Sequence, residues 1–167
     1  MLKIITTMSQ LNEEQLMAVY CEGNTENGQE MFSDYDPAEQ LRFAENAFLS
    51  YLREDFFAHR DSMYMVWVVD GRYRAALRLE PYMDGLLLEA LETAPEDRRK
   101  GYAYSLISSV FDYLNTRDHK RVYSHVSKRN IPSLEIHKKC GFEIISDSAT
   151  YIDGTVTRNS YTLCHQL

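Results

Sequence analysis

Three basic residues in a row, Arg98, Arg99 and Lys100, stand between a strand pattern that ends at Thr93 and a helical pattern that opens at Gly101. A turn from strand into helix points several backbone N–H groups, and the positive end of the helix dipole, at one place. Gly101 lets the backbone approach a ligand because it has no Cβ, and the basic side chains add positive charge. The segment therefore predicts a binding site for an anion such as phosphate.

The common phosphate loops are missing, because the chain contains neither GxGxxG nor GxxxxGK followed by Ser or Thr. Nucleoside triphosphate and dinucleotide sites are therefore not expected. The pattern Arg98-x-x-Gly101-x-Ala103 instead resembles the pyrophosphate-binding signature of the GNAT family of N-acetyltransferases, which reads Gln or Arg, two residues, Gly, one residue, then Gly or Ala. A Pro95-Glu96 pair precedes it here, as in the family.

A second block supports the same resemblance. The segment from Asn130 to Phe142 is similar to the family pattern N-x-x-A/S-x-x-L-Y-x-K-x-G-F, with Asn130, Ser133, Lys139, Gly141 and Phe142 in register. The resemblance covers residues 63–142 by order of elements. It implies an α/β fold of the GNAT type, with a central mixed antiparallel and parallel sheet and helices on both faces.

The resemblance also implies a reaction. Acetyl-CoA would bind where two neighbouring parallel strands separate, and a primary amine would attack its thioester directly. The main chain of the strand at Leu91 and Thr93 would pair with pantetheine, the basic turn would hold pyrophosphate, and Lys138 or Lys139 would lie near the 3′-phosphate. The implied cosubstrate-binding residues are Leu91, Glu92, Thr93, Arg98, Arg99, Lys100, Gly101, Tyr102, Ala103, Asn130, Ser133 and Lys139.

An attacking ammonium must first lose a proton, and Glu89 is the candidate base. It stands in a strand of mostly apolar residues, where a carboxylate needs a reason. Strand alternation predicts that Glu89 shares a face with Leu91 and Thr93, with Glu92 on the other face unless a bulge intervenes. The alternative for Glu89 is an ion pair with an arginine of the adjacent strand, Arg74 or Arg78.

His137 stands where the family pattern most often has a tyrosine that protonates the departing thiolate. A histidine can donate such a proton because it titrates near neutrality. The alternative is a histidine on the helix face that packs or forms hydrogen bonds. We keep Glu89 and His137 as the two predicted catalytic residues.

The elements that position these residues follow from periodicity and turn signals. Asp70-Gly71 and Asp84-Gly85 predict tight turns of an antiparallel meander, and Glu22 to Asp36 reads as a long loop. The predicted strands are Leu2–Ile5, Met63–Val69, Tyr73–Leu79, Leu86–Thr93 and Val122–Val126, followed by a closing hairpin of Phe142–Ile152 and Thr155–Cys164. The predicted helices follow an N-cap at Ser9, open at Asp36-Pro37, and span Lys100–Leu114 and Asn130–Lys139.

Length and charge limit the organisation of the molecule. The chain has 167 residues, 44% of them hydrophobic, which predicts one domain over residues 1–167. Its core would be residues 63–142, with a helical acceptor-side region at 8–60 and the closing hairpin at 143–167. Residues 1–97 carry 7 basic and 19 acidic side chains, whereas residues 98–139 carry 10 and 3. This asymmetry favours an anionic ligand on one part and a cationic acceptor on another.

The remaining features exclude other classes. The cysteines, Cys21, Cys140 and Cys164, form no CxxC pair, so we expect a reducing compartment and no metal site. A cytoplasmic protein without a signal peptide or membrane span is expected. Net charge of -7 argues against nucleic-acid binding. We expect an N-acetyltransferase that acts on a small amine, and the resemblance to the family allows a homodimer. A protein or peptide N-acetyltransferase and an acyl-CoA-binding sensor without catalysis remain alternatives.

Overall fold

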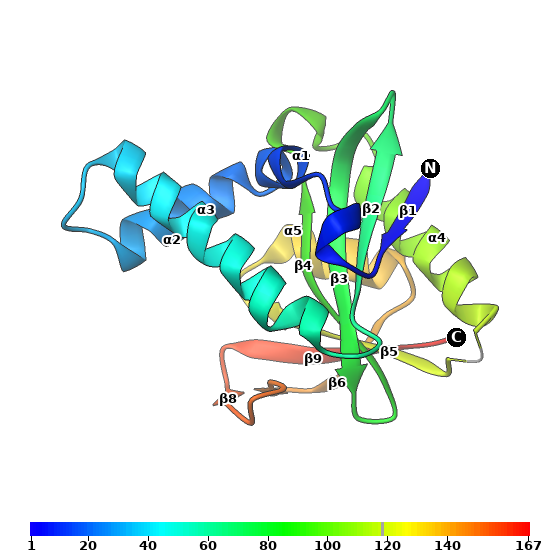
Figure 1. The fold of residues 1–167 in the computed structure, drawn as a ribbon. Helices are drawn as coiled ribbons and strands as arrows, with labels where there is room; N and C mark the ends of the chain where they lie inside the picture. The colour runs from blue at the N-terminus through cyan, green and yellow to red at the C-terminus, as the bar shows by residue number, and fades with distance from the viewer. Residues whose placement is uncertain (118) are drawn as a thin grey trace.

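The computed structural model describes residues 1–117 and 119–167, and a mixed seven-stranded sheet runs through its centre (Figure 1). The order across the sheet is β1-β2-β3-β4-β5-β9-β6, and only the β4–β5 pair in this order is parallel. The strands are β1 (Leu2–Ile5), β2 (Met63–Val69), β3 (Arg72–Tyr82), β4 (Gly85–Thr93), β5 (Arg121–Ser127), β6 (Glu143–Ser146) and β9 (Ser160–Gln166). The predicted mixed α/β sheet is confirmed.

Helices cover both faces of this sheet, as predicted (Figure 1). The first group comprises α1 (Glu13–Val19), α2 (Cys21–Met31) and α3 (Pro37–Glu54), and the second α4 (Tyr102–Asn115) and α5 (Ile131–Lys139). Short 3-10 turns are η1 (Met8–Gln10), η2 (Phe56–Ala58) and η3 (Pro95–Asp97). In Figure 1, α3 passes in front of the strands and α5 lies behind them.

Alternation along the strands divides the apolar side chains between two cores. On β2, Met65 packs in the core beneath α4, whereas Tyr64 and Val66 pack in the core with α1 and α3. The same alternation assigns Ala75 of β3 to the α4 core and Ala76 to the α1–α3 core. Pairing register therefore assigns residues of the sheet to a face, except where the register shifts between Trp67 and Val68 and between Ala76 and Arg78.

Turn chemistry predicted the central meander correctly. β2 pairs with β3 around Asp70 and Gly71, whose φ angles are 51° and 75°, and β3 pairs with β4 around Asp84. The tail differs from a simple hairpin. β6 pairs with β9, and a smaller hairpin of β7 (Ala149–Thr150) and β8 (Val156–Thr157) lies between them.

Two predictions for the N-terminal region are wrong. The N-cap of α1 is Asn12, whose side chain accepts a hydrogen bond from Gln15 N, whereas Ser9 lies in η1. Residues 22–36, predicted as a loop, include most of α2. This helix has no apolar stripe, because Asn24 and Gly28 are its buried residues, and so periodicity did not reveal it.

Candidate active site

A cleft of about 800 Å³ lies between the end of β4, the turn that leads into α4, and α5. This volume suits a small-molecule ligand. All predicted cosubstrate-binding residues except Lys100 line it, namely Leu91, Glu92, Thr93, Arg98, Arg99, Gly101, Tyr102, Ala103, Asn130, Ser133 and Lys139. Two sequence blocks that are separated by about one helix and one strand thus meet at one cleft.

The basic turn has the backbone that an anion site requires. Arg99 and Gly101 have φ angles of 62° and 84°, and α4 begins immediately afterwards at Tyr102. The first N–H groups of a helix have no partner within it, so those of Tyr102 and Ala103 are available at the cleft. No Cβ contact limits Gly101, hence its positive φ is the reason for a glycine there.

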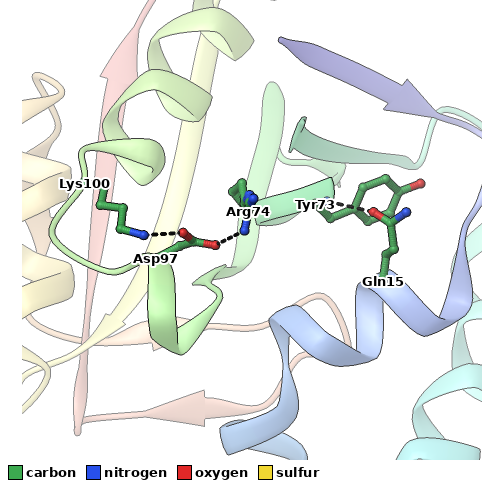
Figure 2. Close-up of polar contacts among 5 residues, drawn as sticks. All are labelled: Gln15, Tyr73, Arg74, Asp97 and Lys100. Carbon is green, nitrogen blue, oxygen red and sulfur yellow. Dashed lines mark hydrogen bonds and ion pairs between the residues drawn. The ribbon is translucent and has the colours of Figure 1, made fainter. Parts of the chain in front are cut away.

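A buried carboxylate holds this turn in place (Figure 2). Asp97, whose side chain is 3% exposed, accepts hydrogen bonds of 2.7 Å from both Arg74 Nη1 and Lys100 Nζ. Lys100 therefore points at Asp97, which explains why it does not line the cleft. The hydrogen bond from Lys100, together with Arg74, holds the pKa of Asp97 below its ordinary value. Sequence analysis missed Asp97, although an acidic residue directly before three basic ones was the available signal.

The parallel strands separate beside the cleft. Pairing of β4 with β5 runs from Leu86 and Val122 to Leu88 and Ser124 and then stops. The next residues, Glu89 and His125, thus stand on the two sides of the opening. An opening of this kind is where the family resemblance places the thioester.

A bulge in β4 changes which side chains share a face. Arg78 of β3 pairs with Glu89 and Ala76 pairs with Glu92, so two residues of β4, Ala90 and Leu91, lie opposite the single residue Leu77 of β3. Ala90 has a φ of 50°, and its carbonyl accepts a hydrogen bond of 2.5 Å from Tyr20 Oη. The bulge that would set aside strict alternation is therefore present, and Glu89 and Glu92 both lie on the α1–α3 face. The prediction that Glu89 shares a face with Leu91 and Thr93 is wrong, because these two residues lie on the α4 face.

Glu89 has charged neighbours on that face. Its Oε2 lies 3.5 Å from Arg78 Nη2, so the ion-pair alternative for Glu89 is realised with Arg78 and not with Arg74. Burial raises the pKa of Glu89, Arg78 opposes the shift, and the neighbouring Glu80 adds to it. Burial likewise raises the pKa of Glu92, with further contributions from the acidic residues of α2.

His137 lies on the opposite face and is 1% exposed. Its Nδ1 lies 2.7 Å from Ser133 O and its Nε2 lies 2.9 Å from Ser124 Oγ. A carbonyl can only accept, so Nδ1 carries the proton and Nε2 accepts from the serine hydroxyl. Burial lowers the pKa of His137, which favours this neutral form. The residue joins α5 to β5 directly beside the strand opening.

The described part of the chain contains no group of three or more His, Cys, Asp or Glu side chains placed to hold a metal ion. Within residues 1–117 and 119–167, no helix is long and apolar enough to cross a bilayer.

The comparisons with known proteins agree on one family. The model of the acetyltransferase (GNAT) family matches residues 28–142. The chain therefore belongs to this family and is an acetyltransferase, for which acetyl-CoA is the typical cosubstrate. A search of the curated proteins found no significant match.

Solved structures show the same fold over the whole chain. The chain is similar to the paia N-acetyltransferase from Thermoplasma acidophilum in complex with coenzyme A, with 12% identity, a TM-score of 0.67, and coverage of 100% of this chain and 99% of that chain. It is also similar to the IAA acetyltransferase from Bacillus cereus, with 14% identity, a TM-score of 0.62, and coverage of 100% of this chain and 99% of that chain. For the ribosomal-protein-S18-alanine N-acetyltransferase from Escherichia coli, the identity is 16%, the TM-score is 0.58, and the coverage is 99% of this chain and 94% of that chain. At these identities the likeness shows the fold alone.

Proposed function

We propose that the protein transfers the acetyl group of acetyl-CoA to a primary amine of a small cationic molecule. One observation carries the proposal. The cleft lies on one side of the β4–β5 opening, and the carboxylates of Glu80 and Glu89 lie on the other side. A thioester at the opening would then be within reach of an amine from the acidic side.

The cosubstrate side supports an extended anion. Arg99 and Lys139 line the cleft together with the start of α4, so cationic side chains and free backbone N–H groups face the same space. Arg98 also lines the cleft, where it is paired with Glu22 at 2.6 Å. The first part of a bound coenzyme A to be recognised there would be its pyrophosphate. The paia N-acetyltransferase of the same fold was solved with coenzyme A, which agrees with this assignment.

The acceptor side supports a cation. Glu80 and Glu89 belong to the strands on the α1–α3 face, whereas Glu92, on the same face, lines the cleft and lies 4.0 Å from Arg98. Carboxylates gathered in a partly buried place attract and hold an ammonium group. Glu89, directly at the opening, remains the proposed base, and its raised pKa brings it closer to that of an effective proton acceptor.

For His137 we propose a positioning role in place of proton donation to the thiolate. Its proton is engaged by Ser133 O, and Nε2 is already occupied by Ser124. The residue would thereby fix α5, with its cleft residues Asn130 and Ser133, against the strand opening.

Three further properties belong to this proposal. The described cysteines are free, which supports a reducing compartment such as the cytoplasm. Strands from both ends of the chain join one sheet, which supports one domain over residues 1–167. The homodimer remains a prediction.

Calorimetric titration with acetyl-CoA and with coenzyme A, followed by thiol release against a panel of primary amines, tests the proposal. We expect Arg99→Glu, in the cleft, to weaken acetyl-CoA binding at least about tenfold. The control Arg158→Glu, an equal charge change in the exposed tail, should leave binding within about twofold.

Tight binding with amine-dependent thiol release would support the transferase. Binding without release from any amine, including lysine-containing peptides, would favour the sensor. Failure to bind would refute the assignment of the cleft.

A further inference from the structure

His125 occupies a place on β5 that the proposed function does not yet use. Pairing of β4 with β5 ends at Leu88 and Ser124, so His125 is the first β5 residue beyond the last pair, as Glu89 is on β4. Arg78, which pairs with Glu89, also pairs with Tyr64 of the α1–α3 core. Alternation from these pairs places Glu89 and His125 on the same face, on either side of the opening.

The His125 ring is unusual because both of its nitrogens are buried without a hydrogen-bond partner among the described residues. Two tyrosine rings pack against it in perpendicular arrangement, Tyr82 of β3 at 5.4 Å and Tyr151 of the tail at 5.0 Å between centroids. Leaving buried polar atoms unpaired costs about 1 to 3 kcal/mol, so a phenyl ring would serve packing better. The imidazole therefore has a role other than holding the fold together.

His137 differs from His125, because its ring lies on the other face and both of its nitrogens have hydrogen-bond partners. A histidine kept for structure has its hydrogen bonds made, as His137 does. His125 instead lies on the same face as Glu89, and each group acts on the pKa of the other across the opening.

We propose that His125 acts with Glu89 as the proton-accepting pair of the acceptor site, with Glu89 touching the amine and His125 positioned behind it as the second proton holder. This proposal rests on the proposed acetyl transfer and adds a residue to it. His125 is a positioning residue in this scheme, since it acts through Glu89.

In the proposed step, proton transfer to Glu89 precedes acyl transfer to the amine. The acceptor ammonium gives one proton to the Glu89 carboxylate, and the freed lone pair forms the N–C bond at the thioester carbon. The C–S bond breaks with its electron pair on sulfur, and the thiolate regains a proton from the nitrogen that has just been acylated. Because no hydrogen bond joins the two side chains in the structure, the Glu89 proton passes through one water to a His125 ring nitrogen and from there through the acceptor site to solvent, which restores the carboxylate.

The pKa directions agree with such sharing. Burial lowers the pKa of His125 and raises that of Glu89, so the two values move towards each other. A proton passes most readily between groups of similar pKa. The charged and titratable groups around the pair are Arg78 and Glu80, with the covering rings of Tyr82 and Tyr151.

The test replaces the imidazole by a ring of similar shape without a proton site, His125→Phe. We expect kcat with a primary amine to fall at least about a hundredfold, the acetyl-CoA Kd to stay within about twofold, and the melting temperature to stay equal or rise. The rising limb of the pH profile of kcat should move as well. His59→Phe, at an exposed histidine, is the matched control and should leave all these quantities unchanged.

A second measurement needs no turnover. The chain has five histidines, so the spectrum of His125→Phe assigns the His125 ring signals by NMR. We expect 1,4-diaminobutane, added to the protein with coenzyme A, to shift them, Glu89→Gln to abolish the shift, and 1,4-butanediol to give none.

The outcomes are separable. A kcat for His125→Phe within about threefold of wild type, a clear loss of stability, or His125 signals that ignore the diamine would each overturn the pair. Failure of coenzyme A binding would instead refute the proposed function, whereas a diamine shift without such binding would leave the His125–Glu89 acceptor site standing.

Discussion

At the scale of single residues, Asp97 shows how a carboxylate that no ligand needs to touch can decide a binding site. It joins Arg74 of β3 to Lys100 of the basic turn through two charged hydrogen bonds (Figure 2). A neutral amide at this position would form only weak hydrogen bonds with the cations of Arg74 and Lys100. We expect Asp97→Asn to lower the free energy of unfolding by about 2 kcal/mol in urea titrations, and to weaken acetyl-CoA binding about tenfold.

The control for this prediction is Glu96→Gln, an equal change at the exposed neighbouring residue. Because the pKa of Asp97 is lowered in the fold, its stabilising effect is complete above the ordinary carboxyl pKa and lost as pH falls through the folded value. The difference in stability between wild type and Asp97→Asn should therefore shrink below pH 4. A difference that persists undiminished at pH 2 would contradict the ion pairs.

His137 leads to a pH prediction of the same sign. Its pKa is lowered mainly by burial, so the stability that its neutral form contributes is present above about pH 6.5 and lost as pH falls. One such proton gives a slope of at most about 1.4 kcal/mol per pH unit. Thermal unfolding between pH 7.5 and 5.5 should show a smaller loss for His137→Gln than for wild type, and equal losses would argue against a neutral buried ring.

At the scale of elements, α2 depends on a glycine at the place where it meets α3. A Cβ on Gly28 would lie 2.7 Å from the backbone oxygen of Gln40, whereas one on Gly23 would meet nothing within 4 Å. We expect Gly28→Ala to destabilise the protein by about 1 to 3 kcal/mol and Gly23→Ala to stabilise it by about 0.5 to 1 kcal/mol. Urea unfolding of both variants checks this, and two stabilising alanines would show that α2 and α3 do not approach so closely.

The β4 bulge gives a second prediction for an element. Ala90 adopts a φ of 50°, which glycine accepts at lower cost, and Tyr20 fixes the carbonyl of the same residue. Ala90→Gly should therefore stabilise the fold by up to about 1 kcal/mol, and Tyr20→Phe should destabilise it by about the same amount. Melting curves measure both, and acetyl-CoA affinity should fall only for Tyr20→Phe. A destabilising Ala90→Gly would contradict the bulge.

These elements also show where sequence analysis succeeds. Local signals were sufficient for the turn at Asp70-Gly71 and for the start of α3 after Asp36, whose carboxylate accepts hydrogen bonds from Ala38 N and Glu39 N. Of the twelve residues predicted to bind the cosubstrate, eleven line one cleft, whereas Lys100 points at Asp97.

The failures have a common physical cause, which is dependence on distant residues. Helix α2 forms against α3 without an apolar stripe of its own, so its sequence alone reads as a loop. The shared face of Glu89 and Glu92 depends on a bulge that Tyr20 fixes from 70 residues away. The alignment of Arg78, Glu89 and His125 across three neighbouring strands likewise becomes visible only once the register of these strands is known.

At the scale of the whole molecule, the uneven charge of the sequence corresponds to the two sides of the strand opening. The excess of acidic residues in 1–97 includes Glu80 and Glu89 on the proposed acceptor side, whereas the basic excess of 98–139 includes the turn and α5 at the cleft. Opposite fields on the two sides would draw an anionic cosubstrate and a cationic acceptor to different entrances. The uncharged residues Leu88 and Ser124 form the last pair of β4 and β5 before the opening.

This arrangement predicts how salt affects the reaction. Exposed charges are screened over about 10 Å at 0.1 M salt, so raising NaCl from 50 to 500 mM should lower kcat/KM for 1,4-diaminobutane about tenfold. The loss for butylamine should be clearly smaller, because its single charge feels the acidic field once. Both amines carry the same reacting group, hence the difference isolates recognition by the field from the chemistry. Equal salt dependence for the two amines would mean that the carboxylates beyond Glu89 do not contribute to acceptor recognition.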